Sequence, residues 1–184
     1  YGYSAWETDE VISFELYRNI LLALGCVFLV TLLFICDIIG AILIITCVLL
    51  TLVDVGGYMH FWGLTINIYT TCTLIISTGL YVDYSIHVAH AFLKQTGGST
   101  EQRIVLAMEE VGPAVFHGGF STFLAICVTS ASANYTWRIF FKVFMMITLF
   151  GLFHGLAFLP VMLSFLSSAK EEAGKSDKED SNRN

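Results

Sequence analysis

One acidic residue inside a long uncharged stretch is the feature of this sequence with the clearest chemical meaning. Asp83 ends a run that starts after Asp54 and contains no Asp, Glu, Lys or Arg. A carboxylate at the centre of a membrane helix costs roughly 2.5–3.5 kcal/mol, so such residues face protein or water and mark ion pathways. If Lys94 marks the membrane surface, Asp83 lies about 16 Å deeper at helical rise, close to the midplane.

Helical spacing extends this acid into a polar stripe. Positions three and four apart share one face of a helix, and they include here Gly79, Asp83, His87, His90 and Lys94. A carboxylate and an imidazole exchange protons near neutral pH, and a glycine lets a helix or a water file approach. We predict an ion-coupling or proton-relay site formed by Gly79, Asp83, Tyr84 and His87, in which Tyr84 donates a hydrogen bond across the helix interface.

A structural role is the alternative for several of these residues. Asp83 would then pair with a polar group on a neighbouring span and fix packing. His90, one turn from Lys94, is best explained as an ordinary interfacial histidine, whereas His87 fits either role.

Small residues in the last two apolar runs predict close helix packing. Gly151 and Gly155 have the small-xxx-small spacing that lets membrane helices approach. We assign Gly118 and Gly119, early in the preceding run, the same packing role. The histidines lack zinc-ligand spacing with a matching second pair, so we expect no metal and no resident cofactor.

The composition indicates a membrane protein that is not an enzyme. Hydrophobic residues make up 56% of the chain and charged residues 13%, against roughly 45–50% and about 25% in soluble domains. There is no basic patch to bind nucleic acid. No serine near a histidine has an orienting acid, which argues against hydrolytic chemistry. Asp37 and Asp54 lie at expected span ends, where solvation or helix capping explains them.

Five apolar stretches predict an all-α fold with five transmembrane helices. A continuous helix over residues 20–53 would extend about 51 Å, far beyond a hydrocarbon core of about 30 Å, so a tight hairpin is expected at Asp37. The aromatic residues after Gly56 and Gly57, which should close the second span, resemble an interface belt. The predicted spans cover about residues 18–36, 38–55, 61–94, 114–133 and 139–166.

The remaining segments predict short or irregular structure. Ser99 and Gln102 have capping-box spacing, which indicates a short interfacial helix over about residues 100–111, ended by Gly112 and Pro113. Pro160 should kink the fifth span or loosen its last turns. Residues 169–184 have no apolar periodicity and are expected to form a disordered tail.

Basic residues predict the orientation. Lys94, Arg103 and the basic residues of the tail fall on one side of a five-span arrangement. The positive-inside rule then places the tail and the interfacial helix in the cytoplasm, and residues 1–17 outside.

Several runs carry a resemblance to a known family. They are LYRNILLALGCVFLVTLLFICD, LTLVDVGGYMHFWGLTIN, GLYVDYSIHVAHAF, VGPAVFHGGFSTFLA and FGLFHGLAFLPVMLSF. In this order, over roughly residues 10–168, they resemble the C-terminal membrane half of Patched-type proteins, which belong to the resistance-nodulation-division superfamily.

This resemblance implies a fold and a site. Family members have twelve spans in two pseudo-symmetric halves, so residues 18–168 would form the last five spans and residues 1–17 the end of a missing second ectodomain. Gly79 and Asp83 match the family's Gly-x-x-x-Asp motif in the tenth span, which faces an acid in the fourth span. The resemblance assigns them to ion coupling, although Tyr81 replaces the usual serine, a change that adds bulk and predicts an altered pore or weaker ion coupling.

The implied activity is transport of a sterol or lipid, coupled to a transported proton or sodium ion. The implied partners are the N-terminal membrane half, the bilayer and the lipid ligand, and the implied location is the plasma membrane or endosomes. A sterol-responsive receptor or regulator without net transport is the alternative. A non-functional fragment from an incomplete gene model is a third possibility.

Overall fold

The structure, a computed structural model, describes residues 3–95 and 97–168, with side chains from Val11 onward. The predicted tail at 169–184 lies outside the described residues. Within them the chain is helical and contains no strand, which confirms the all-α prediction. The elements are α1 (Tyr3–Ile35), α2 (Ile38–Phe61), α3 (Ile68–Lys94), α4 (Thr100–Ser130), α5 (Tyr135–Phe153) and the π-helical turn η1 (His154–Phe158), followed by α-helix over 159–168.

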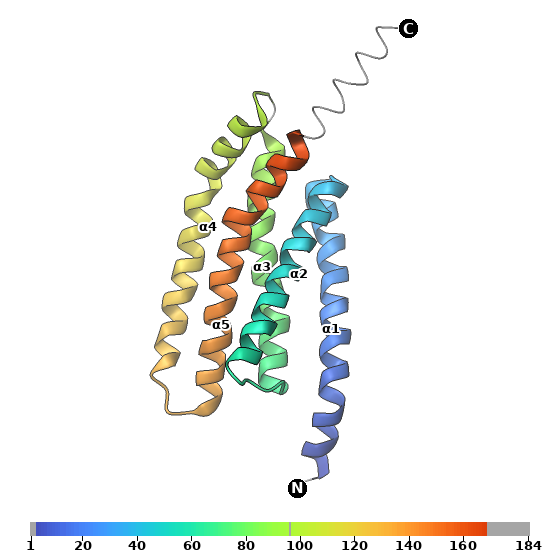
Figure 1. Cartoon of the computed structure of the whole chain (residues 1–184), viewed down its shortest axis with the longest axis vertical. Helices are drawn as coiled ribbons and strands as arrows, with labels where there is room; N and C mark the ends of the chain where they lie inside the picture. Colours follow the sequence, from blue (N-terminus) through green and yellow to red (C-terminus); the bar gives the residue numbers. More distant parts are fainter. Residues whose placement is uncertain (1–2, 96, 169–184) are drawn as a thin grey trace.

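The helices form an elongated bundle in which α3 lies behind α2 and α5 in the view of Figure 1. α3 contacts each of the other helices, whereas α1 contacts only α2 and α3 among the described elements. α1 and α4 lie at opposite flanks of the bundle. The most completely buried side chains, such as Ile44, Val48, Tyr81 and Ile147, come from α2, α3 and α5. These three helices therefore build the core.

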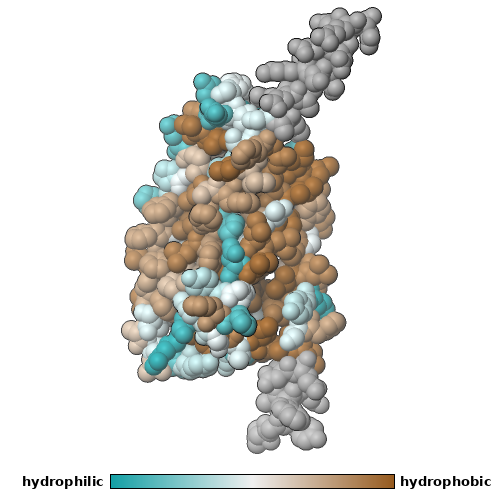
Figure 2. All heavy atoms as spheres, in the orientation of Figure 1, coloured by the Kyte–Doolittle hydropathy of each residue, from teal (hydrophilic) through white to brown (hydrophobic). Residues whose placement is uncertain are grey.

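The bundle has the surface of a membrane protein. Four helical segments are long and apolar enough to cross a bilayer, namely 11–35, 38–61, 100–130 and 135–168. The face in Figure 2 is mostly hydrophobic, and its hydrophilic atoms lie toward the two ends and in one streak near the middle. α3 is too polar to meet the same criterion, so the predicted count of five spans is not confirmed. Its 27 residues extend about 40 Å, which is enough to cross the hydrocarbon core.

The first two helices meet in a tight hairpin, as predicted. α1 ends at Ile35, and Cys36 adopts a left-handed backbone conformation with φ of 51°. Asp37 then caps α2, because its carboxylate accepts a hydrogen bond of 2.7 Å from the Gly40 N–H. Residues 3–17 are helical and continuous with the first span, and their assignment to an ectodomain stays a prediction.

The second helix is longer than predicted. α2 continues through Gly56 and Gly57 to Phe61, so the predicted end of the second span near residue 55 is wrong. A glycine inside a helix costs only about 1 kcal/mol relative to alanine, and burial of Val55 and Met59 on the same helix favours its continuation. The chain turns instead at Gly63, where φ is 63°.

The third helix is correspondingly shorter at its start. α3 begins at Ile68, after a turn, and not near residue 61 as predicted. Asn67 caps it, since its side chain accepts hydrogen bonds from the backbone N–H groups of Tyr69 and Thr70. The Thr70 hydroxyl accepts in return from the Asn67 N–H, which completes a capping box.

The predicted interfacial helix over residues 100–111 is not a separate element. α4 runs without a break from Thr100 to Ser130 and passes through Gly112 and Pro113, so their assignment as a helix end is wrong. A proline removes one backbone hydrogen bond, which long membrane helices tolerate when neighbouring groups compensate. The capping box of Ser99 and Gln102 at the start of α4 is confirmed.

Pro160 affects the last helix through a π-helical turn. α5 begins at Tyr135, four residues earlier than predicted, and changes at His154 to the wider winding of η1. There the Leu159 N–H donates to the His154 carbonyl, five residues back. Because proline lacks an N–H and its ring crowds the preceding turn, one wider turn just before it relieves the clash. The sequence predicts a kink or looser last turns near Pro160, and the π-helical turn is a local loosening of this kind.

Candidate ion-coupling site on α3

The predicted polar stripe occupies one exposed side of α3. Its members are all exposed, namely Gly79, Asp83, His87, His90 and Lys94. Tyr81, Tyr84 and Val88, between them in the sequence, are buried on the opposite side. Helical spacing therefore predicted the face of α3 that does not pack against the rest of the bundle.

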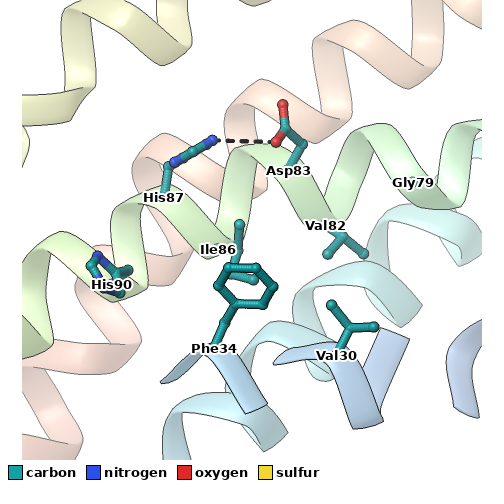
Figure 3. A pocket seen from close by; sticks show the side chains of 8 residues that line it. All are labelled: Val30, Phe34, Gly79, Val82, Asp83, Ile86, His87 and His90. Atoms are coloured by element: carbon teal, nitrogen blue, oxygen red, sulfur yellow. Dashed lines mark ion pairs between the residues drawn. The ribbon is translucent and has the colours of Figure 1, made fainter. Parts of the chain in front are cut away.

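Asp83 and His87 form a close pair within the stripe. His87 Nε2 lies 3.3 Å from Asp83 Oδ1, one helical turn away, and Figure 3 shows the imidazole directed at the carboxylate. Both side chains are well exposed, at 63% for the acid and 60% for the histidine. The pair can exchange a proton between carboxylate and imidazole, and both groups remain accessible to a further ligand.

A hollow of about 540 Å³ opens beside this pair on the α1 side. Val30 and Phe34 of α1 form one wall, and Val82 and Ile86 of α3 form another (Figure 3). The polar groups along its border are those of Asp83, His87 and His90. An apolar hollow with a few convergent polar groups is the usual character of a ligand site.

A second hollow, of about 210 Å³, borders the same pair on the α4 side. Asp83 and His87 share its lining with Tyr84 and with residues of α4, namely Val111, Ala114, Val115 and Gly118. The acid–histidine pair thus lies between two open spaces. A Cβ at Gly79, one turn before the acid, would meet no atom within 4 Å, so an approaching group finds room there.

Two of the predicted packing glycines lie directly against the tyrosines of α3. A Cβ at Gly151 would come 3.0 Å from a Tyr81 ring carbon, and one at Gly155 would come 3.1 Å from Tyr84 Cβ. A side chain at either position would force the neighbouring tyrosine to shift. They allow the backbones of α3 and α5 to approach closely.

Gly118 and Gly119 differ from each other. A Cβ at Gly119 would come 2.6 Å from Leu152 Cδ2, so this glycine lies in the contact between α4 and α5. At Gly118 a Cβ would meet nothing within 4 Å of the described residues. Gly118 lines the α4-side hollow opposite Asp83 and Tyr84 of α3, and its predicted packing role stays a prediction.

The tyrosines do not join the stripe. The Tyr84 hydroxyl is buried and faces Thr122 of α4, so the predicted hydrogen bond across the helix interface stays a prediction. Tyr81, which is 1% exposed, packs against Gly151. Its bulk, which replaces the family's serine, is accommodated toward α5 and does not enter the space around Asp83.

A second acid–histidine pair was missed in the sequence. His154 Nε2 of η1 lies 3.5 Å from Asp54 Oδ2 of α2. Asp54 was interpreted as a residue at a span end, but α2 continues beyond it to Phe61. The only signal was that each is an ionisable residue within an apolar run, and no motif joins two residues so far apart in the chain.

A metal centre finds no support in the geometry. The described residues contain no group of three or more His, Cys, Asp and Glu side chains that could hold a metal ion. The ion-coupling role of Asp83 and His87 stays a prediction.

Comparison with known proteins places the chain in a family. No family model matches it. It is 35% identical to the Niemann-Pick type C1-related protein of Toxoplasma gondii, over 92% of this chain and 15% of that protein. It is 32% identical to the NPC intracellular cholesterol transporter 1 of Sus scrofa, over 84% of this chain and 12% of that protein. It is 29% identical to protein patched homolog 3 of Caenorhabditis elegans, over 92% of this chain and 12% of that protein.

The helical fold with its apolar surface and ionisable stripe defines a multi-pass integral membrane protein. Within that class, the chain belongs to the family of Patched and Niemann-Pick type C1 proteins, as the sequence motifs indicated. The chain spans about an eighth of the length of these relatives, at 12–15%.

Proposed function

We propose that this chain forms the C-terminal membrane half of an ion-coupled sterol or lipid transporter, in which Asp83 binds and releases the coupling ion. The observation that carries the proposal is the exposed Asp83–His87 pair, with 3.3 Å between Oδ1 and Nε2, between two hollows on α3. The similarity to a protein named as a cholesterol transporter supports the sterol or lipid as the transported class.

The exposure of Asp83 supports a partner outside this bundle. A carboxylate that remains 63% exposed on a helix within the membrane is costly against lipid. The proposed cover is the N-terminal membrane half of the same protein, which would bring its own acid opposite Asp83. Two facing carboxylates repel each other when both are ionised. Such a pair therefore favours binding of one proton or one sodium ion between them.

The hollow toward α1 supports an apolar ligand near the ion site. Its walls include Val30, Phe34 and Ile86, and its polar border includes Asp83. In the proposed cycle, binding of an ion at the acid changes the packing around this hollow. Lipid movement would take place through the rest of the protein, and no chemical reaction on the lipid is proposed.

The orientation proposal rests on the turn between α3 and α4. Lys94 Nζ lies 3.4 Å from Glu110 Oε1, and Arg103 stacks on the Phe92 ring at 4.5 Å. This cluster of basic residues suits the cytoplasmic surface. We accordingly propose a cytoplasmic C-terminus, residues 1–17 outside, and residence in the plasma membrane or endosomes.

The test is Asp83→Asn in the full-length protein, reconstituted into vesicles with an imposed proton or sodium gradient. We expect gradient-dependent sterol or lipid movement to fall to background, while expression and membrane insertion match the wild type. Asp37→Asn is the matched control, because asparagine caps a helix about as well as aspartate. Unchanged transport by the Asp83→Asn protein would overturn the proposal.

The hollow of about 540 Å³ also favours a second function, a sterol-responsive regulator without net transport. In that case sterol would bind beside Asp83 and change the association of a partner protein. Lipid distribution would then be the same in the wild type and the Asp83→Asn protein, while sterol still altered the amount of partner bound.

A further inference from the structure

The acid–histidine pair between α2 and η1, of which only the histidine is buried, has no part in the proposed coupling at Asp83. The His154 side chain is 9% exposed, and its Nε2 lies 3.5 Å from Asp54 Oδ2. The Asp54 side chain is 42% exposed, so the carboxylate is accessible from outside the bundle whereas the imidazole is enclosed. The two residues belong to different helices and thus join two elements of the core.

The hydrogen bond on the other side of the imidazole fixes where its protons can be. His154 Nδ1 lies 2.9 Å from the Phe150 carbonyl oxygen. A carbonyl oxygen only accepts, so Nδ1 must carry a hydrogen. A neutral imidazole would then present the lone pair of Nε2 to the lone pairs of the Asp54 carboxylate. That arrangement is repulsive unless one further proton lies on either the ring or the carboxylate.

The groups around His154 supply no other counter-charge. From α3, Tyr81 and Tyr84 face this segment. From α2, Tyr58 packs its ring on Phe150, at 5.5 Å between centroids. From α4, the contacts with the last helix are apolar, and they involve Gly119, Ala107 and Met108. Asp54 is thus the only carboxylate that faces His154 among the described residues.

The winding of the last helix at His154 also supports a functional role for the pair. The π-helical turn η1 begins at His154, and such turns occur often at functional sites.

The pair lies at the depth of the α3 site, on the other side of that helix. Gly155, next to His154, contacts Tyr84, which is next to Asp83. Tyr84 is buried toward α5, whereas Asp83 faces outward. Two acid–histidine pairs therefore flank α3 at one level of the membrane.

We propose that Asp54 and His154 are a second proton-binding site, in which one exchangeable proton joins α2 to the π-helical turn. With the proton present, the imidazole donates to Phe150 and shares a hydrogen with Asp54. Its departure leaves two sets of lone pairs face to face and weakens the contact between the helices. This site is complete within the present chain and does not depend on the function proposed for Asp83.

Spectroscopy on the full-length protein in phosphatidylcholine vesicles tests the proposal. ¹⁵N-labelled histidine reports a doubly protonated ring, and infrared spectroscopy reports the C=O stretch of a protonated carboxyl group. Near neutral pH we expect one of these two signatures in the wild type. Subtracting the spectrum of His154→Gln or of Asp54→Asn from that of the wild type assigns the signature to its residue. In Asp54→Asn the imidazolium signature should be lost, because the new amide donates to Nε2.

His117→Gln is the matched control, since this exposed histidine of α4 has only a ring contact with Phe116 among the described residues. It should leave both assigned signatures unchanged. Asp83→Asn should also keep them, even where it abolishes transport, which separates this proposal from the previous one. A wild-type protein with a singly protonated His154 and an ionised Asp54 would overturn the proposal. Only the two variants that assign the signatures, His154→Gln and Asp54→Asn, need to fold for this measurement.

Discussion

The two acid–histidine pairs that flank α3 differ in what surrounds them. Asp83 and His87 belong to one helix and are both more than half exposed, and the other ring nitrogen of His87 has no hydrogen bond to the described residues. Asp54 and His154 come from two helices, and the second ring nitrogen of His154 is fixed by a backbone carbonyl. The same residue types thus form an open site and an enclosed one.

The difference shows which pair needs a partner. His87 can place a hydrogen on Nε2 and donate it to Asp83 as a neutral ring, so that pair needs no additional proton. Because the Asp83–His87 pair is exposed, and exposure to lipid is costly, we expect another part of the protein to cover it. The enclosed pair needs one additional proton but no further protein. Substitutions on the two sides of α3 test this difference between the pairs.

The largest effect is expected for Tyr81→Ser, which restores the family's residue. Tyr81 is buried against Gly151 on the enclosed side of α3, so the change leaves a cavity and should destabilise the bundle by about 3–5 kcal/mol. Thermal unfolding in detergent measures this. Coupling at Asp83 should be unaffected in the folded fraction, and an increase in coupling there would contradict the placement of Tyr81 away from the open site.

Truncation of the two histidines should separate the pairs. His154→Ala should cost about 1–3 kcal/mol, since it removes a buried side chain and leaves Asp54 partly screened by water. His87→Ala should change stability by less than about 0.5 kcal/mol, because its side chain is 60% exposed. Unfolding midpoints of the two variants measure the difference. Equal losses of stability would show that the enclosed pair contributes no more to packing than the open one.

The smallest effect concerns the neighbouring glycines of α4. Gly119→Ala should cost about 1 kcal/mol, because its Cβ would crowd the end of the flexible Leu152 side chain. Gly118→Ala should be neutral or slightly stabilising, since alanine favours helix and the position is open. The two unfolding midpoints compare a packed position with an open one, and a greater loss for Gly118→Ala would reverse the assignment.

The sequence predicted well what depends on local spacing. The turn at Asp37 and the capping box at Ser99 follow from side chains near their own backbone, and both are present. The exposed stripe around Asp83 followed from helical periodicity alone. Each of these features involves residues within a few positions of one another, so the pattern contains all the necessary information.

Helix ends marked by glycine and proline were predicted less well. Gly57 and Pro113 lie inside continuous helices, because a long apolar helix gains more from packing than one such residue costs. The Asp54–His154 pair could not be predicted, since it depends on how α2 packs against the turn that Pro160 induces. Contacts between distant segments have no local signature in one sequence.

Asp83, on the open face of α3, is the residue that we propose to bind the coupling ion. The most direct measurement is uptake of protons or sodium ions by vesicles that contain the full-length protein, recorded when lipid or sterol substrate is added. We predict substrate-dependent uptake for the wild type and for the Asp37→Asn control, and none for Asp83→Asn at equal protein content. Uptake by Asp83→Asn equal to that of the wild type would contradict the claim.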